Sequence, residues 1–338
     1  MGETYEAAGV SLAAADEAVE RLKTHVRSTY RPEVLGDIGG FGGLFALPPG
    51  LREPVLVSST DGVGTKLKVA EAAGRFDSIG IDLVAMCVDD IAVQGADPLF
   101  FLDYVGVGRL DPVVTEEVVA GISAGCRTAG CALVGGEIAE HGDGHSMDLA
   151  GFVVGVVERS AIITGEAIRP GDVLVGLASP GLRSNGYSLA RRVLLPRPEL
   201  LDEPAWDGAD RTLADELLLP SVIYSPTAAA LRRAVPVHGF AHVTGGGIPG
   251  NLVRVLPPDV DAVVRMRSWP VPRIFDEIAR VGEVAADEMA RVFNLGIGMI
   301  AAVAPADAGT AIAVLEAHDV AAFAIGDIVS GTGQVRLA

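Results

Sequence analysis

Short oxygen-bearing side chains, glycines and one lysine are concentrated in the heptapeptide TDGVGTK, which spans residues 60–66. Its chemically useful members are Thr60, Asp61, Gly62, Gly64, Thr65 and Lys66. An apolar run, Pro54–Val57, precedes a polar loop beginning at Ser58, and a helix-like segment follows. Such a loop can present backbone N–H groups to an anion. It is not a P-loop, because the lysine follows a threonine. We therefore predict a phosphate and metal site, with an ordinary turn as the alternative.

Carboxylates follow two other apolar segments. Asp89 and Asp90 lie near the end of a predicted buried helix, and Glu137 follows a strand and paired glycines. Neighbouring carboxylates repel unless they are solvated, paired or share a metal. A solvated surface pair is the alternative, but the apolar setting favours a metal or a hydrogen-bonded role for one of the two. Asp61 and Glu137 both follow strands, so we expect these acids to converge at one edge of a sheet.

Other candidate residues have two interpretations each. His242 precedes Thr244 and three glycines, so it is either a structural histidine or a phosphate contact at a helix N-terminus. Ser184 and Asn185 begin an SNG turn that is first a helix cap and second an anion cradle. Lys23 lies in a predicted helix, where a solvated face is favoured. A glycine-rich loop at residues 35–47 could close over a ligand.

Hydrophobic periodicity and turn residues place these motifs on an alternating set of elements. Predicted helices span residues 11–27, 78–94, 115–128, 184–194, 221–233, 249–256 and 306–317. Predicted strands span residues 99–105, 131–134, 149–157, 172–178, 262–266, 298–303 and 321–325. A boundary is expected within residues 163–171. The alternation predicts an α/β layered architecture with two domains.

The composition narrows the functional class. The chain has 338 residues, 49% of them hydrophobic, and a net charge of −18, which argues against a nucleic-acid partner. No apolar run reaches the roughly 18 residues that span a bilayer, and the acidic start lacks signal-peptide features, so we expect no membrane partner and a cytoplasmic protein. Cys87, Cys126 and Cys131 form no CxxC pair and are expected to be buried thiols rather than zinc ligands.

Together these motifs resemble one family, the phosphoribosylformylglycinamidine cyclo-ligases, also called aminoimidazole ribonucleotide (AIR) synthetases. The resemblance runs almost end to end and in the family's order. The motifs are YEAAGV at Tyr5, RPEVLG at Arg31, GGFGGLFALP at Gly39, TDGVGTK at Thr60, GIDLVAMCVDD at Gly80, QGADPLFFLDY at Gln94, GCALVGGEIAE at Gly130, SNGYSLAR at Ser184 and HVTGGG at His242.

The resemblance implies an ATP-dependent ring closure in purine biosynthesis. Formylglycinamidine ribonucleotide is converted to 5-aminoimidazole ribonucleotide, with release of ADP and phosphate. In the implied route, ATP phosphorylates the formamide oxygen to give an iminophosphate, and the amidine nitrogen of the same molecule then attacks. Alternative members of the superfamily are selenophosphate synthetases and thiamine-monophosphate kinases, and a catalytically inactive nucleotide-binding paralogue is a further alternative.

The resemblance also assigns roles to residues. Asp61, Asp90 and Glu137 match acids expected to hold Mg²⁺ on ATP, a hard cation that prefers oxygen ligands. Lys23, Asp90 and His242 are the implied catalytic residues. The implied ATP-binding set is Gly40, Gly42, Thr60, Asp61, Gly62, Gly64, Thr65, Lys66, Ser184 and Asn185.

Three features depart from the family pattern. Arg183 stands before the SNG motif, where many members have histidine, and an arginine does not transfer protons near neutral pH. Asp89 stands where asparagine is common. The loop after Glu140 is shorter than usual.

The family fold implies two α/β (α+β) domains. We expect an N-terminal, dimerising sheet domain that binds ATP and metal over residues 1–167. A helix-flanked sheet domain is expected over residues 168–338. A homodimer acting on a phosphoribosyl substrate follows from the resemblance.

Overall fold

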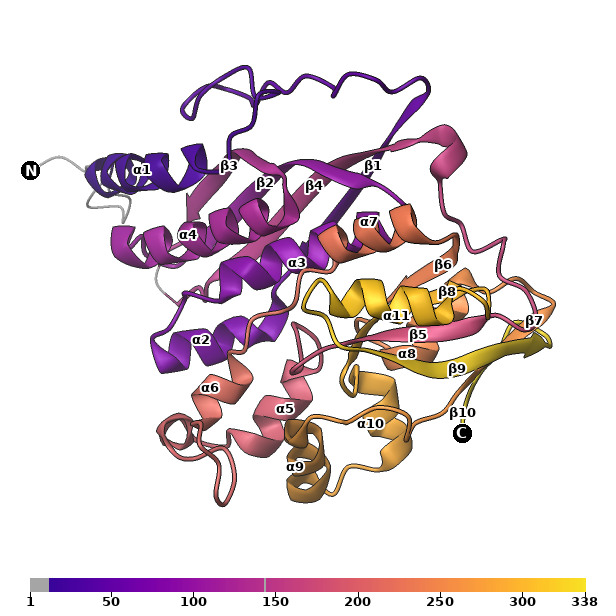
Figure 1. Cartoon of the computed structure of the whole chain (residues 1–338). Coiled ribbons are helices and arrows are strands. Elements are labelled where there is room, and N and C mark those ends of the chain that lie inside the picture. The colour runs from indigo at the N-terminus through magenta and orange to yellow at the C-terminus, as the bar shows by residue number, and fades with distance from the viewer. Residues whose placement is uncertain (1–11, 143) are drawn as a thin grey trace, which may run out of the picture.

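Two β-sheets divide the chain between them, as Figure 1 shows. The computed structural model describes residues 12–142 and 144–338. The motif at Tyr5 and the predicted helical residue Ser11 lie outside these described residues, as does residue 143. The first sheet has the strand order β1-β4-β2-β3, and the second has the order β10-β7-β9-β5-β8-β6. Two separate sheets are the basis of a two-domain α/β fold.

The strands are β1 (Pro54–Gly62), β2 (Asp97–Val107), β3 (Ala132–Glu140), β4 (Asp148–Glu158), β5 (Val173–Ala178), β6 (Val237–His242), β7 (Val260–Val264), β8 (Ile297–Val303), β9 (Ala322–Ser330) and β10 (Val335–Leu337). The helices are α1 (Leu12–Arg27), α2 (Leu67–Ala73), α3 (Ile79–Ala92), α4 (Pro112–Ala129), α5 (Tyr187–Leu194), α6 (Leu213–Leu217), α7 (Ser225–Ala234), α8 (Gly247–Leu252), α9 (Arg273–Gly282), α10 (Ala286–Val292) and α11 (Ala308–Glu316). Short 3₁₀ helices occur at Gly64–Lys66, Arg159–Ala161, Pro198–Asp202 and Val253–Val255.

Helix α3 is the central helix of the N-terminal unit. Nearly all of its residues are buried, which is typical of a helix that is apolar around its whole circumference. It packs on β1, β4 and α4, and its C-terminal end also contacts α7 of the second unit. Because α3 bridges both units, polar residues near its end are well placed to form a site between them.

Local signals explain where α4 begins and ends. The Asp111 carboxylate accepts hydrogen bonds from the N–H groups of Val113 and Val114, and Pro112 occupies the first turn. Gly130 ends the helix with a φ of 73°. This helix therefore starts three residues before the predicted position at Thr115.

The C-terminal sheet buries both of its faces. Successive residues of β8 belong alternately to two apolar clusters: Met299 and Ala301 lie in one, and Ile300 and Ala302 lie in the other. One cluster includes α7 and α11 residues, and the other includes α8 residues. This period of two is what a strand covered by helices on both sides requires. The predicted helix-flanked sheet is confirmed.

Some predicted elements were wrong in detail. Residues Ser58–Gly62 are strand rather than loop, because each pairs in register with a residue of β4. The helix predicted from Ser184 begins only at Tyr187, after a turn. Strands β6 and β10 and helices α6, α9 and α10 were not predicted. The three cysteines are buried free thiols, as expected. No helix among residues 12–142 and 144–338 is long and apolar enough to cross a membrane.

Candidate active site between the two sheets

The two acids near the end of α3 point into different surroundings. Asp89 is fully buried and accepts hydrogen bonds from the backbone N–H groups of Tyr224 and Ser225, at 2.8 and 3.0 Å. Its other oxygen lies 2.8 Å from Nη2 of Arg183. Burial raises the pKa of Asp89, against the opposing charge of Arg183. Asp89 is therefore an internal ion-pair partner, not a cleft residue.

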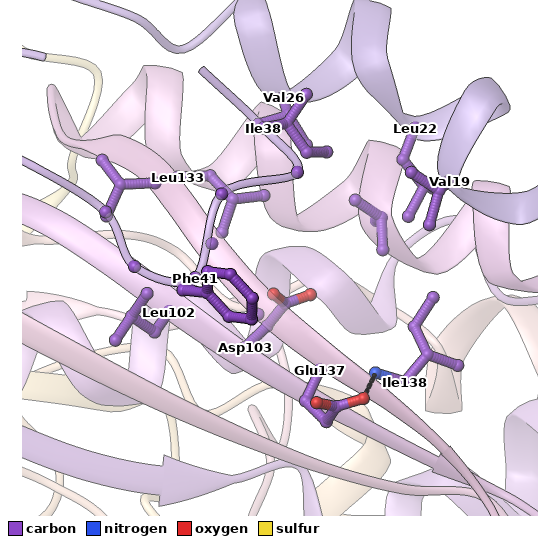
Figure 2. Close-up of a pocket in the computed structure, with 18 of the residues that line it drawn as sticks. Val19, Leu22, Val26, Ile38, Phe41, Leu102, Asp103, Leu133, Glu137 and Ile138 are labelled. Atoms are coloured by element: carbon purple, nitrogen blue, oxygen red, sulfur yellow. Dashed lines mark hydrogen bonds between the residues drawn. The ribbon is translucent and has the colours of Figure 1, made fainter. Parts of the chain in front are cut away.

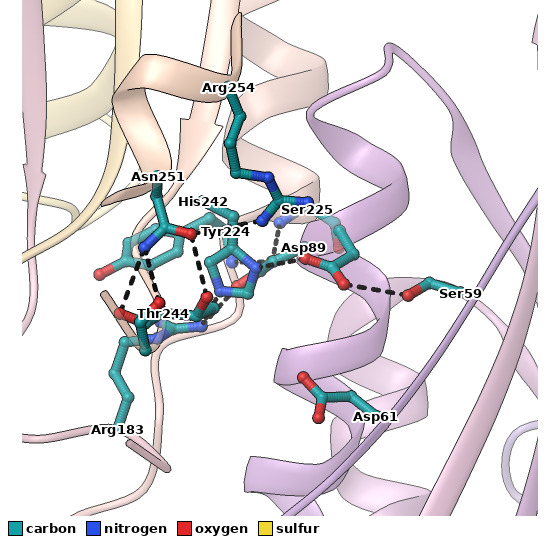
Figure 3. Close-up of polar contacts among 12 residues, drawn as sticks. Ser59, Asp61, Asp89, Arg183, Tyr224, Ser225, His242, Thr244, Asn251 and Arg254 are labelled. Carbon is teal, nitrogen blue, oxygen red and sulfur yellow. Dashed lines mark hydrogen bonds and ion pairs between the residues drawn. The ribbon is translucent and has the colours of Figure 1, made fainter. Parts of the chain in front are cut away.

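Asp90 faces the cleft between the two units, and 40% of its side chain is exposed. Its Oδ1 lies 2.8 Å from Nδ1 of His242, and its Oδ2 accepts a 3.0 Å hydrogen bond from Ser59 (Figure 3). Partial burial is the largest single effect and works to raise its pKa, but the contacts with His242 and Ser59 and the charge of Arg254 together outweigh it, so the pKa is lowered. Asp90 is thus presented to the cleft as an ionised oxygen ligand.

Asp61 is the second acid at this place. Its Oδ1 accepts a 2.7 Å hydrogen bond from the N–H of Gly62, and its Oδ2 has no hydrogen-bond partner among the described residues. Burial raises the pKa of Asp61, and the charge of Asp90 raises it further. Figure 3 shows Asp61 with no hydrogen bond to the network around His242. The charge of Asp90 disfavours the ionised form of Asp61, and a cation bound between the two carboxylates would relieve that repulsion.

Three turns from distant parts of the chain meet beside these acids. Thr65 Oγ1 lies 3.3 Å from Ser188 Oγ, so the heptapeptide 60–66 contacts the start of α5. A methyl group added at Gly245 would lie 3.8 Å from Nδ2 of Asn185. Among the described residues, Ser184 Oγ and Asn185 Oδ1 are buried without a hydrogen-bond partner. The SNG turn therefore presents two unsatisfied polar atoms beside the turn at residues 244–247. The Ser184 hydroxyl can donate to an anion, whereas the Asn185 oxygen can only accept, as from a ligand hydroxyl or N–H group.

The helix-cap interpretation of Ser184 is not supported. The residue before α5 is Gly186, and no side chain caps the helix. Thr60 also has a structural contact, since its hydroxyl donates a 2.8 Å hydrogen bond to the carbonyl of Gly151. Gly62 and Gly64 lie at the end of β1 and in the 3₁₀ helix that follows.

The structure places Lys66 away from any open surface. Its ammonium group is fully buried, 2.6 Å from Asp82 Oδ2, and donates a 2.6 Å hydrogen bond to the carbonyl of Leu219. Burial lowers the pKa of Lys66, and Asp82 opposes that shift. The interpretation of Lys66 as a phosphate neighbour is therefore corrected: its contacts are structural.

A second pocket lies within the N-terminal unit, with a volume of about 890 Å³. It is lined by the apolar side of α1, the loop at residues 37–43 and strands β2 and β3, as Figure 2 shows in part. Gly40 and Gly42 belong to that loop and line the pocket. Glu137 lies in it beside Asp103.

Lys23 stands next to this pocket on α1. It is four residues after Val19 and three before Val26, both of which line the cavity, so it shares their side of the helix. Its ammonium group pairs with Glu20. The structure thus places Lys23 near the glycine-rich loop rather than near His242.

The predicted convergence of acids was wrong for Glu137. Strands β1 and β3 are opposite edges of the first sheet, with β4 and β2 between them. Gly62, Ala150, Tyr104 and Glu137 are aligned across the four strands, so Asp61 and Glu137 are separated by three inter-strand spacings, roughly 14 Å. Within the described residues, no group of three metal-binding side chains is assembled.

Sequence reasoning missed three residues of these sites. Among the described residues, Arg254 is the one lysine or arginine that lines the cavity of about 530 Å³ between the units, and its charge helps to lower the pKa of Asp90. Asp103 lines the other pocket, where burial raises its pKa to about 7. Asp82 pairs with Lys66. An aspartate within the apolar sequence of α3 was the available signal for a buried cation.

Two family descriptions match the chain. The N-terminal domain of AIR synthase related proteins matches residues 50–157, and the C-terminal domain matches residues 169–337. A phosphoribosylformylglycinamidine cyclo-ligase of Myxococcus xanthus (strain DK1622) is 55% identical over 99% of this chain and 98% of its own length. This chain belongs to the phosphoribosylformylglycinamidine cyclo-ligase family. A second cyclo-ligase, from Geobacillus kaustophilus (strain HTA426), is 48% identical over 98% of this chain and 97% of its own length.

Solved structures share the fold at much lower identity. A thiamine-monophosphate kinase from Stenotrophomonas maltophilia K279a has a TM-score of 0.69 and 18% identity, and covers 95% of both chains. The hydrogenase maturation protein HypE in complex with ATP has a TM-score of 0.70 and 20% identity, over 97% of this chain and 92% of its own. These likenesses confirm the two-domain α/β fold and nothing more specific.

The family assignment confirms several predictions from the sequence. The chain is a ligase of the cyclo-ligase family that acts in purine biosynthesis and uses ATP. It closes the ring of formylglycinamidine ribonucleotide to give 5-aminoimidazole ribonucleotide, ADP and phosphate. The kinase and the maturation protein among the structural neighbours have identities that show the fold alone.

Proposed function

We propose that ring closure takes place in the cleft between the two sheets, around Asp61, Asp90 and His242. The observation that carries this proposal is the presentation of Asp90 to the cleft by two donors, His242 and Ser59, from different strands. Asp90 and His242 line a cavity of about 530 Å³, a volume that suits a small phosphorylated ligand.

Mg²⁺ is the second part of the proposal. Asp61 and Asp90 supply hard carboxylate oxygens, and each has an oxygen or exposed surface left over from its protein contacts. These residues fit Mg²⁺, which is usually held by one or two carboxylates together with substrate phosphates and water. Glu137 lies too far from Asp61 to share the same ion, so we assign it to the nucleotide pocket instead.

The nucleotide is proposed to occupy the pocket between α1 and β3. Its walls are largely apolar, from Val19, Leu22 and Leu133, and the glycines of the loop allow close backbone approach. A methyl group added at Gly42 would meet no atom of the described residues within 4 Å, which leaves room for a ligand beside the loop. Lys23 stands at the side of this pocket and is the proposed cationic contact for ATP. ATP, when bound, supplies the phosphoryl group that makes the formyl oxygen a leaving group.

The phosphoribosyl substrate needs cationic and N–H donors at the opposite end of the site. Arg254 lines the cleft and is proposed to bind the substrate phosphate, since a guanidinium matches phosphate geometry. Ser184 and Asn185, whose buried polar atoms lack partners, are proposed to complete the substrate contacts. The residues then act by holding and aligning charge.

Ring closure suits a site of this kind. The attacking amidine nitrogen and the activated carbon belong to the same molecule, so correct orientation alone can supply on the order of 7–11 kcal/mol in the most favourable cases. His242 lies against Asp90 at the cleft wall and is proposed to contact the reacting part of the substrate. The main tasks of the protein are exclusion of water and neutralisation of phosphate charge.

A homodimer and a cytoplasmic location complete the proposal. The outer side of the first sheet exposes apolar side chains, with Leu56 at 60% and Phe152 at 39% exposure. Covering such a surface favours association with a second copy. We place the boundary between the units at residues 167–168, between the two sheets. A mass in solution equal to one chain of 34.8 kDa, at micromolar concentration, would contradict the dimer.

The reaction itself is tested by incubating purified protein with formylglycinamidine ribonucleotide, ATP and Mg²⁺. The expected result is formation of the aromatic amine product with one ADP for each turnover. Intact ATP and no amine would overturn the proposal. Omitting Mg²⁺ and adding a chelator is expected to abolish turnover.

The cleft assignment is tested by Asp61→Asn and Asp90→Asn. Each is expected to lower kcat/KM at least about tenfold, a loss of roughly 1.4 kcal/mol of transition-state stabilisation. Glu53→Gln is the control, because Glu53 is an exposed acid just before β1, with 68% of its side chain exposed. Near-normal rates in both aspartate variants would remove these residues from the site. Arg254→Gln is expected to raise KM for the ribonucleotide while KM for ATP stays close to that of the unmodified protein.

A further inference from the structure

Arg183 is an arginine enclosed where the two units meet. It is 2% exposed and has a positive φ of 63°, which non-glycine residues rarely adopt. Its guanidinium lies over the ring of Tyr224, 4.8 Å from the centroid, and Nη1 donates a 2.7 Å hydrogen bond to the carbonyl of Val222. A strained, buried cation held by this many contacts has a defined orientation.

The donor and acceptor pattern around Arg183 determines where the His242 proton lies. Nη2 of Arg183 is 2.8 Å from Asp89 Oδ2 and 3.1 Å from Nε2 of His242. A guanidinium can only donate, so Nε2 must accept. The ring proton is then on Nδ1, from which it is donated to Oδ1 of Asp90, 2.8 Å away. The chain of contacts therefore leads from Asp89 through Arg183 and His242, which are labelled in Figure 3, to Asp90.

Asp89 has no free acceptor direction toward the cleft. One oxygen receives two backbone N–H groups and the other faces the guanidinium, and the side chain is fully buried. Its role in this arrangement is to hold Arg183. Arg183 in turn has one N–H of Nη2 for Asp89 and one for His242, so losing either partner disturbs the other.

We propose that Arg183 and Asp89 form one positioning unit. The guanidinium held by Asp89 fixes His242 in the Nδ1–H tautomer, and this tautomer orients the Asp90 carboxylate toward the cleft. With His242 and Ser59 each donating to one oxygen, the remaining lone pairs of Asp90 are those available to a ligand. The role of Asp90 as a ligand-binding carboxylate rests on the proposed function. The assignment of the His242 tautomer is independent of that function.

The two residues are expected to be replaceable only together. Removing one charge leaves the other buried and unpaired, which is strongly unfavourable. The resemblance described above places histidine and asparagine at positions 183 and 89 in many relatives, which is a neutral pair. Arg183→His combined with Asp89→Asn therefore exchanges a charged pair for a neutral one without an uncompensated charge.

The tautomer is measured by ¹⁵N NMR of histidine-labelled full-length protein without substrate. The chain has six histidines, and the His242 signals are those absent from His242→Gln. We expect protonated Nδ1 and bare Nε2 in the unmodified protein. Arg183→Met is expected to give a mixture of tautomers. A protonated Nε2 in the unmodified protein overturns the proposal, even when Arg183→Met does not fold.

Kinetics provide the second readout. Arg183→His and Asp89→Asn alone are each expected to lower kcat at least about tenfold with KM changed by less than about threefold. The double variant is expected to recover to within about threefold of the unmodified protein. Additive losses in the double variant would refute coupling between the two residues.

A matched pair on the surface serves as the control. Arg232 of α7 lies 2.6 Å from Asp97 of β2, so this pair also joins the two units, but Asp97 is 55% exposed. Arg232→His, Asp97→Asn and their combination are expected to leave kcat and the His242 tautomer unchanged. Absence of turnover in the unmodified protein together with the expected tautomer would refute the proposed function and leave the positioning unit intact.

Discussion

Asp103 makes the folding stability of this protein dependent on pH in a predictable direction. Its carboxylate lies on β2, in the pocket below the glycine-rich loop, and pairs with no cation among the described residues. Burial raises its pKa from 3.8 to about 7. The folded protein therefore binds more protons here than the unfolded chain between these two values, and its stability falls as the pH rises through that window.

The magnitude follows from the pKa. A pKa that is about 3 higher in the folded than in the unfolded state changes the free energy of unfolding by roughly 4 kcal/mol between low and high pH. About 2 kcal/mol of this change falls between pH 5.5 and 8.5. The side chain keeps some contact with solvent in the pocket, so we expect about 1–2 kcal/mol in practice. Asp103→Asn removes the ionisable group while retaining its shape. The variant should be more stable than the unmodified protein at pH 8.5, with the difference shrinking toward pH 5.5.

The assay is urea unfolding of the ligand-free protein at several pH values from 5.5 to 8.5. Asp37→Asn is the matched control, because Asp37 lines the same pocket and its pKa is lowered to about 2 by the hydrogen bond from Arg27. That group contributes stability above pH 3.8 that is lost as the pH falls toward 2, outside the measured range. A stability difference for Asp103→Asn that does not change with pH would refute the reasoning.

Two further predictions concern stability. Lys66→Met should lower the free energy of unfolding in urea by about 3–5 kcal/mol, because Asp82 stays buried without its counter-ion. Combining Lys66→Met with Asp82→Asn should recover more than half of that loss. A Lys66→Met variant as stable as the unmodified protein would contradict the role of the buried ion pair. Gly186→Ala should cost about 1–3 kcal/mol or more, since Gly186 has a φ of 79° and an added methyl group would lie 2.2 Å from a ring carbon of Phe293. Gly208→Ala is the control for backbone strain alone, because Gly208 has a φ of 76° and an added methyl group would meet no atom of the described residues within 4 Å. Equal losses of stability in Gly186→Ala and Gly208→Ala would show that the clash with Phe293 contributes nothing.

Local patterns in the sequence were sufficient for much of the fold. The apolar spacing in α1 and the continuous apolar character of α3 predicted both helices, since periodicity depends only on neighbours along the chain. Turn residues next to regular elements also marked three polar segments: the motif at residues 60–66, the SNG turn, and the glycine-rich turn that follows His242. Their closeness in space is consistent with the family resemblance. The strand at Ser58–Gly62 was missed because both of its faces carry polar residues: Ser58 and Thr60 are exposed, and Ser59 contacts Asp90 of α3, so no apolar alternation marks the strand.

Only the tertiary structure decided which charged groups meet. Asp61 and Glu137 follow similar strand-and-glycine patterns, yet the strand order puts them on opposite edges of one sheet. Asp89 and Arg183, noticed separately as departures from the family pattern, are ion-paired across the two units. Strand order and the partners of buried charges depend on contacts between residues distant in sequence, which local spacing does not encode. The sequence by itself therefore determined the elements and the reaction class, and the packing of the two units determined how the site residues are held.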